Sequence, residues 1–460
     1  MSIVAFLKEA IPGEIKELIN KGDLKGAEEA IKDMLSRTKD FFKRRRLEYE
    51  LFRIYVLRNE YNLTYDEAFS KFREEIPDIS ESEFRELINE RKVDCRSIDG
   101  EMRFFKFFIF NFFKLNKEWE KRRKKRRDEK REMARKKLYE QQDIIKKIAK
   151  TKDGYLMPIK FRVRHTVSVK PGVVPDGEKL RIWIPVPRKC ELQSNIRIVR
   201  YYPKRPYIAH EEALQRTAYF EVPMTEEGAK VWIEYEYTCK AFFKRVDPSK
   251  ILPYDENSDI YVKYTSEKPP HIVFTPRLEK LAKDIVGTEK NPYVKAKKIY
   301  EWIVKNVTYN LPYEYALYDN IPEFVATNLK GDCGMQALLF ITLCRIVGIP
   351  ARWQSSWYMN PISPSPHDWA QFYVEPYGWL YVDPSIGGGM PEDRKPFYFG
   401  NIDNFRMIAN SDIMVQFDPP KVYFRSDPVD NQRGEVEWKG GNLYFDKWNY
   451  KIEILEYKML

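Results

Sequence analysis

Cysteine and histidine are scarce in this chain, and their scarcity narrows the chemistry it can perform. The 460 residues include five cysteines without a C-x-x-C pair and four histidines without an H-E-x-x-H pair. A disulfide framework and a four-ligand zinc site are therefore not expected. We predict neither a bound metal nor another cofactor.

Long apolar runs are also lacking. The most apolar stretch, Phe104 to Phe113, has ten residues, whereas a helix that crosses a bilayer needs about 20. The first eleven residues lack the charged start and the longer apolar stretch of a secretory signal. We therefore expect a cytoplasmic protein without a transmembrane segment.

The chain does contain enough apolar residues to build several cores. Hydrophobic residues make up 43% and aromatic residues 15%, and the length predicts two to four domains. Residues 1–150 have helical spacing, with capping boxes at Thr64 and Ser80. A hairpin signal follows around Asp99-Gly100. We predict a helical domain over 1–150, whose helix–turn–helix–hairpin order is also that of a winged-helix unit.

The positive net charge of +11 is concentrated in one segment. Residues 117–137 contain thirteen basic and five acidic residues, including seven consecutive basic residues from Lys121 to Arg127. Few apolar residues interrupt this segment, so we predict a long solvated helix that links two domains. Two interpretations stay open, a charged connector or a surface that binds an anionic partner such as nucleic acid or a membrane.

From Met157 onward the apolar residues recur with period two. This pattern predicts strands and a β-sandwich domain over 155–245. Helical spacing returns between 276 and 304 and is followed by mixed helix and strand patterns, which indicate an α+β domain over 255–400. Strand-like patterns predict a β-rich C-terminal segment over 405–460. The predicted fold class is thus multidomain α+β.

Cys333 is the residue that points most directly to chemistry. It lies in the segment Lys330 to Gly334 and directly precedes the amphipathic run Met335 to Val347. Asp332 can cap that helix and place Cys333 in its first turn. Unpaired N–H groups and the helix dipole would there stabilise a thiolate.

Two further residues complete a pattern. His367 stands at the entrance of a predicted strand, and the chain turns at Pro376 to Gly378 and returns antiparallel. This return brings Asp383 beside residues 369–371. A thiol, an imidazole and a carboxylate in this order indicate a nucleophile, its base and the group that orients the base.

Three stretches carry a family resemblance: KIYEWIVKNVTYN (298–310), GDCGMQALLFITLCRIVGIPAR (331–352) and HDWAQFYVEPYGWLYVDPS (367–385). They resemble the transglutaminase-like superfamily, which is related to the papain-like cysteine proteases. The resemblance implies a transglutaminase-like core and a catalytic triad of Cys333, His367 and Asp383. It implies a protease- or deamidase-like hydrolase or acyl transferase that acts on protein or peptide amides through a thioester.

Departures from the family pattern refine this expectation. Animal cross-linking enzymes have Gly-Gln-Cys-Trp and an acidic calcium site, whereas this chain has Gly-Asp-Cys-Gly and no such acidic cluster, so hydrolysis is favoured. Candidate substrate-binding residues are Trp353, Trp357, Trp369 and Tyr309, although aromatic residues of this kind also pack cores. The alternative function is a non-catalytic binding scaffold.

Overall fold

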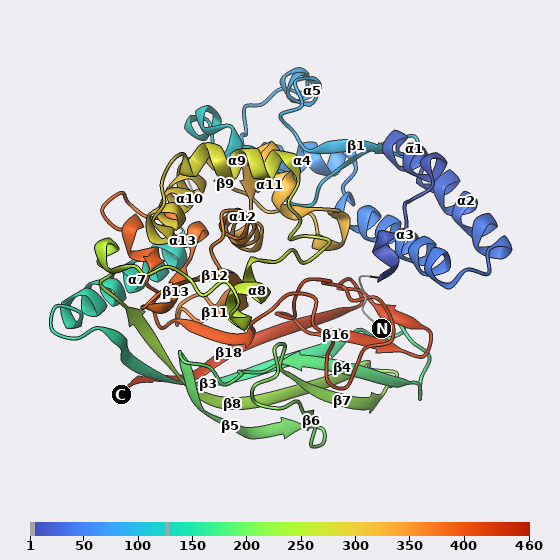
Figure 1. Cartoon of the computed structure of the whole chain (residues 1–460). Helices are drawn as coiled ribbons and strands as arrows, with labels where there is room; N and C mark the ends of the chain where they lie inside the picture. Colours follow the sequence, from blue (N-terminus) through green and yellow to red (C-terminus); the bar gives the residue numbers. More distant parts are fainter. Residues whose placement is uncertain (1–4, 125–127) are drawn as a thin grey trace. The chain divides into compact units, whose positions relative to one another are not determined.

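Residues 5–124 and 128–460 of this computed structural model are described, and they divide into two units (Figure 1). Unit 1 holds the N-terminal residues together with segments 308–319 and 330–332, and unit 2 holds the remainder. In neither described range does a helix combine the length and the apolar character needed to cross a membrane.

Side-chain caps determine where several helices of unit 1 begin. Thr64 and Ser80 each accept a hydrogen bond from the N–H three residues on, and the glutamates there bond back, so both predicted capping boxes are present. The helices of this unit are α1 (Gly13–Lys21), α2 (Leu24–Arg37), α3 (Phe41–Glu60), α4 (Tyr65–Glu75), α5 (Glu81–Asn89) and α6 (Phe108–Leu115).

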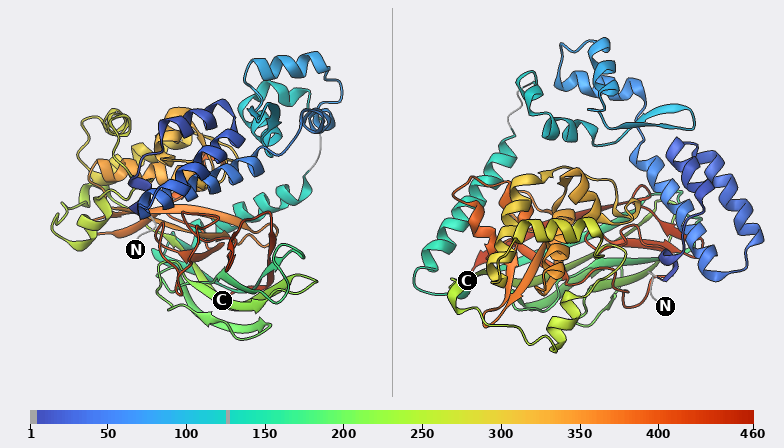
Figure 2. Two further views of the ribbon diagram at one scale, coloured as in Figure 1. Left: turned by 90° about the vertical axis from the view of Figure 1, so that its right-hand side faces the viewer. Right: turned by 45° about the horizontal axis from the view of Figure 1, so that its top comes forward.

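A hairpin joins these helices into one core. Strands β1 (Cys95–Ile98) and β2 (Glu101–Phe104) pair antiparallel around Asp99 and Gly100, which both have positive φ as a tight hairpin turn requires. The Asp99 N–H donates to the carbonyl of Gly22 between α1 and α2, and β2 packs against α4. The helices and the hairpin of this unit can be followed by their blue to cyan colours in Figure 2. Phenylalanines from α4, α5, β2 and α6 fill the centre of this core.

The basic segment does not form the single helix predicted over 117–137. Lys117–Lys121 form a short 3-10 helix, residues 122–124 are not helical, and α7 begins only at Glu129 (Glu129–Ile148), where Asp128 caps it. Consecutive cations repel one another along a helix, whereas an acidic cap stabilises a new start. Residues 125–127 of the basic run lie outside the described residues.

Strands with period-two burial build two sheets in unit 2. One has the order β18-β3-β8-β5 and the other β17-β16-β4-β7-β6. Residues 154–243 supply the strands β3 (Gly154–Val169), β4 (Lys179–Pro185), β5 (Gln193–Tyr202), β6 (Tyr207–Ile208), β7 (Thr217–Pro223) and β8 (Ala229–Phe243). Their inner faces share one apolar core, as in a sandwich.

The last strands of the chain complete both of these sheets. They are β16 (Glu435–Trp438), β17 (Gly441–Leu443) and β18 (Trp448–Met459). Strand β16 pairs with β4, and β18 pairs with β3 along nearly its whole length. The sandwich is therefore built from segments far apart in the sequence, a pairing that period-two patterns alone do not specify.

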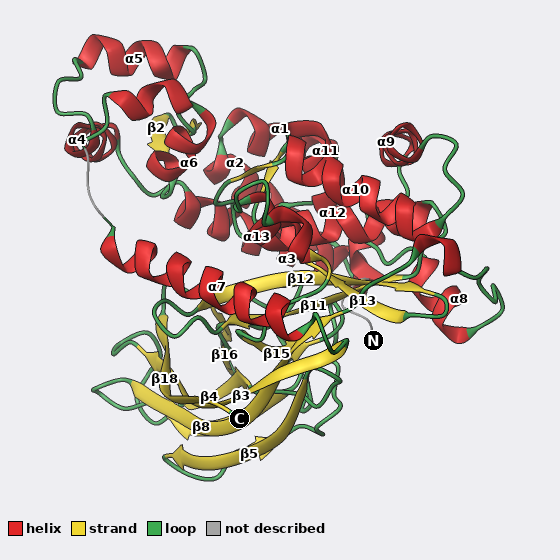
Figure 3. Ribbon diagram, turned by 90° about the vertical axis from the view of Figure 1, so that its left-hand side faces the viewer, coloured by secondary structure: helices red, strands yellow, loops and turns green. Residues whose placement is uncertain are grey.

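A third sheet carries the predicted site. Its antiparallel order is β14-β13-β12-β11-β15, formed by β11 (Ala351–Tyr358), β12 (Ser365–Val374), β13 (Gly378–Val382), β14 (Phe399–Gly400) and β15 (Arg406–Asn410). Helix α12 (Cys333–Ile346) packs on β12. Figure 3 shows α12 on one side of this sheet and the sandwich strands on the other.

Further helices surround α12 and bury it from Cys333 through Arg345. They are α8 (Asp259–Thr265), α9 (Pro276–Val286), α10 (Pro292–Asn306), α11 (Ile321–Asn328) and α13 (Pro384–Gly388). A helix apolar on every side can be buried in this way. Such enclosure leaves the first turn of α12 in a fixed position.

We predict that Leu339→Ala, in the fully buried middle of α12, lowers the free energy of unfolding by about 2–5 kcal/mol because it leaves a cavity. The matched control is Leu455→Ala on β18, where the side chain is 43% exposed and the expected loss is about 0.5 kcal/mol or less. Urea unfolding followed by tryptophan fluorescence measures both. Equal losses in the two variants would contradict the central place of α12.

Candidate active site

Cys333 is the first residue of the buried helix α12. Its N–H and those that follow lie in the first turn, where they have no acceptor within the helix. The side chain is buried, with 7% of the residue exposed. A sulfur at this position lies at the positive end of the helix dipole, as the sequence predicted.

Strands β12 and β13 place an imidazole next to a carboxylate. His367 is the third residue of β12, and Ala370 pairs with Val382, so Asp383 follows directly at the end of β13. His367 Nε2 lies 2.7 Å from Asp383 Oδ2. The antiparallel return expected from the sequence therefore brings these two residues together.

Both oxygens of Asp383 are engaged. Oδ1 accepts hydrogen bonds from the N–H of Ile386 and the hydroxyl of Ser385, which caps α13. Oδ2 accepts from His367 and from the Arg406 guanidinium, which is also 2.7 Å away. Four donors hold a carboxylate with no exposed surface, and its orientation toward His367 is fixed.

Arg406 is a residue that the sequence analysis missed. It is fully buried on β15 and bridges Asp383 and Asp403, each at 2.7 Å. Its guanidinium carbon lies 5.0 Å from the ring centre of Trp369 and 5.3 Å from that of Tyr358. No motif marks this arginine, because it reaches the site only through the pairing of β15 with β11.

Neighbouring charges determine the protonation states of Asp383 and Arg406. Burial alone would raise the pKa of Asp383, but the charges of His367 and Arg406 and their hydrogen bonds outweigh it, so this pKa lies well below its ordinary range. Burial alone would lower the pKa of Arg406, yet Asp403 and Asp383 raise it above its ordinary value. Asp383 is thus a permanent anion beside the imidazole.

A carboxylate other than Asp383 contacts the Cys333 thiol. Cys333 Sγ donates to Asp368 Oδ2 at 3.2 Å, and Asp368 is buried directly after His367 on β12. The side-chain amide of Gln432 donates to Asp368 Oδ1 and also to Asp430 Oδ2, the latter at 3.1 Å. The sequence analysis placed Asp368 only in a strand, although its position next to His367 was a usable signal.

Three of the four aromatic residues predicted to bind substrate are buried. Trp353, Trp357 and Trp369 are at most 2% exposed, and each indole N–H donates to a protein acceptor. Buried indoles of this kind support the sheet beneath the site, so their position does not favour substrate contact. Tyr309 lies in β9 (Thr308–Tyr309) of unit 1, which pairs with β10 (Lys330–Gly331).

The other cysteines are poor nucleophiles. All five are free. Burial raises the pKa of Cys95 and of Cys190 to about 11, and it raises those of Cys239 and Cys344 further. Within residues 5–124 and 128–460, no group of three or more His, Cys, Asp or Glu side chains is placed to hold a metal.

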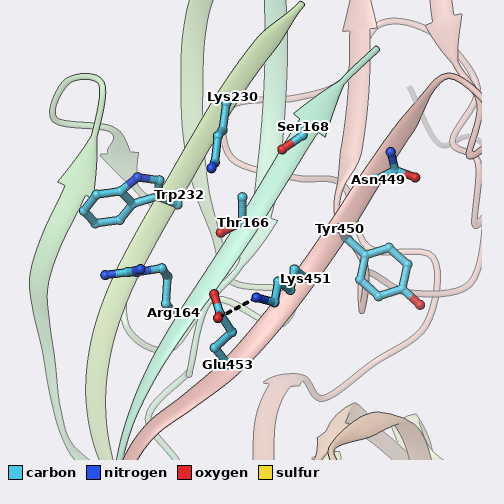
Figure 4. Close-up of a pocket in the computed structure, with 9 residues that line it drawn as sticks. All are labelled: Arg164, Thr166, Ser168, Lys230, Trp232, Asn449, Tyr450, Lys451 and Glu453. Carbon is cyan, nitrogen blue, oxygen red and sulfur yellow. Dashed lines mark hydrogen bonds and ion pairs between the residues drawn. The ribbon is translucent and has the colours of Figure 1, made fainter.

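One hollow lies on the sandwich rather than at the thiol. It has a volume of about 220 Å³ and is shown in Figure 4. Its walls come from β3, β8 and β18 and are formed by Arg164, Thr166, Ser168, Lys230, Trp232, Asn449, Tyr450, Lys451 and Glu453. The Lys451–Glu453 ion pair at 2.6 Å neutralises part of its charge. It contains none of the three predicted triad residues.

A thiol at a helix start and an imidazole oriented by an ionised carboxylate define a class of site. Thiol-dependent acyl-transfer enzymes use groups of these three kinds. Because Asp383 is ionised, His367 Nε2 must carry the hydrogen it donates. In a neutral ring Nδ1 then keeps a lone pair that can accept a proton.

The family follows from the sequence of this region. Residues 279–384, which contain Cys333, His367 and Asp383, match the transglutaminase-like superfamily. The predicted resemblance to this superfamily is therefore confirmed for residues 279–384.

Individual relatives are distant. An uncharacterized protein of Haemophilus influenzae is 24% identical over 245 residues, which cover 46% of this chain and 65% of that protein, so the match spans less than two thirds of the relative. A candidate cysteine protease of Cytophaga hutchinsonii overlaps 65% of this chain and 91% of its own, with 16% identity and a TM-score of 0.41.

The periplasmic domain of TgpA from Pseudomonas aeruginosa is another similar structure. It is 14% identical, with a TM-score of 0.28, and the overlap covers 53% of this chain and 96% of that domain. Nothing further is drawn from these two structural overlaps.

We expect iodoacetamide at pH 7 to modify Cys333 before any other cysteine. A thiol with a pKa of about 11, as at Cys95 and Cys190, has roughly one thiolate in ten thousand molecules at this pH. Peptide mass spectrometry locates the modification. Labelling of Cys95 or Cys190 at the rate of Cys333 would contradict an activated thiol.

We further predict that Arg406→Met destabilises the fold by about 3–5 kcal/mol, because it leaves the buried Asp383 and Asp403 without their cation. The control is Arg197→Met, whose side chain is 67% exposed in its ion pair with Glu236 and should cost at most about 1 kcal/mol. Thermal unfolding measures both. A loss at position 406 no larger than that at position 197 would show that the bridge is dispensable.

Proposed function

We propose that this protein is a cysteine-dependent amide hydrolase or acyl transferase that acts on protein or peptide amides through a thioester. The observation that carries the proposal is the 2.7 Å contact between His367 Nε2 and the ionised Asp383, in the same domain as a cysteine at a helix start. The match of residues 279–384 to the transglutaminase-like superfamily supports it.

The first half-reaction forms the acyl-enzyme. His367 Nδ1 takes the proton of the Cys333 thiol, and Sγ attacks the carbonyl carbon of the amide. The imidazolium is stabilised by Asp383, to which its Nε2–H donates. It then gives its proton to the leaving amine as the carbon–nitrogen bond breaks, so that a thioester and a neutral His367 result.

Negative charge develops on the carbonyl oxygen during this attack. The Cys333 N–H is a suitable donor for it, because first-turn N–H groups have no acceptor within their helix. Trp302, Tyr309 and Asn310, which lie in the family-like stretch 298–310, are candidates for a second donor.

The second half-reaction decides between hydrolysis and transfer. His367 takes a proton from water or from an acceptor amine, which attacks the thioester carbon, and Cys333 leaves as a thiol once the proton is returned. Water gives a carboxylate and an amine gives a new amide. The Gly-Asp-Cys-Gly sequence around Cys333 favours water.

A non-catalytic scaffold is the second candidate, and one observation favours it. Cys333 is only 7% exposed, so a substrate carbonyl must reach a largely covered sulfur. A scaffold would bind its partner equally well after Cys333→Ser, whereas an enzyme would lose turnover.

An anionic partner and a cytoplasmic location also remain predictions. For an anionic partner the basic run offers fewer open charges than the sequence indicated, because Arg122 and Arg123 pair with Glu83 and Glu75 at 2.7 and 2.8 Å. A salt titration of nucleic-acid binding tests it. Cytoplasmic residence is compatible with five free cysteines, and cell fractionation tests it.

We expect Cys333→Ser and His367→Ala to abolish cleavage of glutamine-containing and peptide amide substrates. Asp383→Asn should reduce kcat by about 10²–10⁴-fold, since an asparagine no longer enforces the tautomer or stabilises the imidazolium. Ammonia release and peptide mapping report hydrolysis, and incorporation of a fluorescent primary amine reports transfer. Glu375→Gln, which changes a carboxylate at the far end of the same hairpin, should leave both rates near those of the wild type.

A screen of diverse protein and peptide amides in which the wild type and Cys333→Ser behave alike would sink the proposal. A substrate processed only by the wild type would establish it.

A further inference from the structure

The contact between Cys333 and Asp368 is unusual for a nucleophile, because a carboxylate repels a thiolate and so disfavours its formation. Sγ donates its hydrogen to Asp368 Oδ2 over 3.2 Å. Asp368 is 3% exposed, and Gln432 holds its other oxygen. This carboxylate therefore acts as an acceptor on both oxygens, which is the role of an ionised group.

The contact bears on the protonation of the resting nucleophile. Only a neutral thiol can donate to Asp368, since a thiolate has no hydrogen and would lie about one hydrogen-bond length from a like charge. Two unit charges at such a distance repel strongly inside a protein. The proton must leave Sγ for His367 before Cys333 can attack, and this transfer breaks the bond to Asp368.

We propose that Asp368 is a positioning residue of the active site that holds the Cys333 thiol in its protonated resting form and opposes thiolate formation. This inference deepens the proposed function, because it assumes that Cys333 is the nucleophile. The two aspartates act in opposite directions: Asp383 stabilises the imidazolium of the activated pair, and Asp368 destabilises its thiolate. The resting enzyme is thereby kept less reactive than a cysteine–histidine pair alone would be.

The charged groups around the contact belong to several elements. His367 precedes Asp368 on β12, and Asp332 precedes Cys333 in the chain, where its Oδ1 accepts from the Tyr315 hydroxyl at 2.6 Å. Asp430 lies on the far side of Gln432, and burial raises its pKa. Among these groups, Asp368 is the carboxylate whose hydrogen bond to Sγ is described.

Three further side chains hold Asp430, and through it the Gln432 amide that donates to both Asp368 and Asp430. Arg425 donates to the backbone carbonyl of Asp430, and Ser355 donates to its carboxylate. The Trp353 indole donates to the Ser355 hydroxyl at 3.0 Å. Gln432 therefore presents its amide to Asp368 from a fixed position, and Asp368 presents Oδ2 to the thiol.

The test measures the iodoacetamide rate at Cys333 against pH, with the modified residue located by mass spectrometry. Asp368→Asn removes the like charge, so the midpoint of the profile should fall by at least about one pH unit. Alkylation one unit below the wild-type midpoint should then be several-fold faster. Asp368→Glu keeps the charge and should stay within about 0.3 unit. Glu375→Gln controls for the change in net charge.

A midpoint for Asp368→Asn that is unchanged or higher overturns the proposal. If this variant does not fold, the S–H stretching band of the wild type decides instead, identified by its loss in Cys333→Ser. A band shifted to the frequency of a strongly hydrogen-bonded thiol at pH 7 is expected. A band at the free-thiol frequency, or no band because the thiolate is already formed, overturns the proposal.

These outcomes are separable from those of the proposed function. If Asp368→Asn shifts the midpoint but no amide is cleaved by the wild type, the role of Asp368 holds and the proposed function fails. If amides are cleaved and the midpoint does not move, the proposed function holds and the inference about Asp368 fails.

Discussion

The ionised carboxylate of Asp383 is the constraint on which the site depends. A buried anion is stable only when its oxygens are fully paired, and Asp383 meets this demand with a helix cap, an imidazole and a guanidinium. Each partner comes from a different element, namely α13, β12 and β15. The carboxylate therefore ties the end of the hairpin to the edge of the sheet and sets the angle of His367 at the same time.

The need to pair the Asp383 carboxylate also determines the surroundings of Arg406 in unit 2. Its charge is balanced by Asp383 and Asp403, and aromatic rings of Trp369, Tyr358 and Tyr398 lie within 6 Å of it. Trp369, one of the three tryptophans predicted to bind substrate, thus packs against the charges behind the imidazole. Removing water from these ion pairs strengthens them.

The sequence predicted the local features of this molecule better than its long-range ones. The capping boxes of α4 and α5, the start of α12 at Cys333 and the return of β13 beside His367 all depend on neighbours within a few residues, and the structure contains each of them. The pairing of β18 with β3 and the arrival of Arg406 and Gln432 at the site join segments far apart in the chain. No local pattern encodes such pairings. The prediction of an unbroken basic helix over 117–137 was wrong for another reason. It was based on composition, which does not take into account the repulsion between consecutive cations.

The interleaving of the two units in the chain has a consequence for biosynthesis. Unit 1 lacks segments 308–319 and 330–332 until the ribosome has passed them, and the sheet β18-β3-β8-β5 lacks β18 until residues 448–459 emerge. N-terminal regions commonly fold first during synthesis, but here neither unit can be completed early. Cys333 would accordingly meet His367 and Asp368 in their final arrangement only after the strands that complete unit 2 have been synthesised, which limits the time that a nascent chain could expose a reactive thiol.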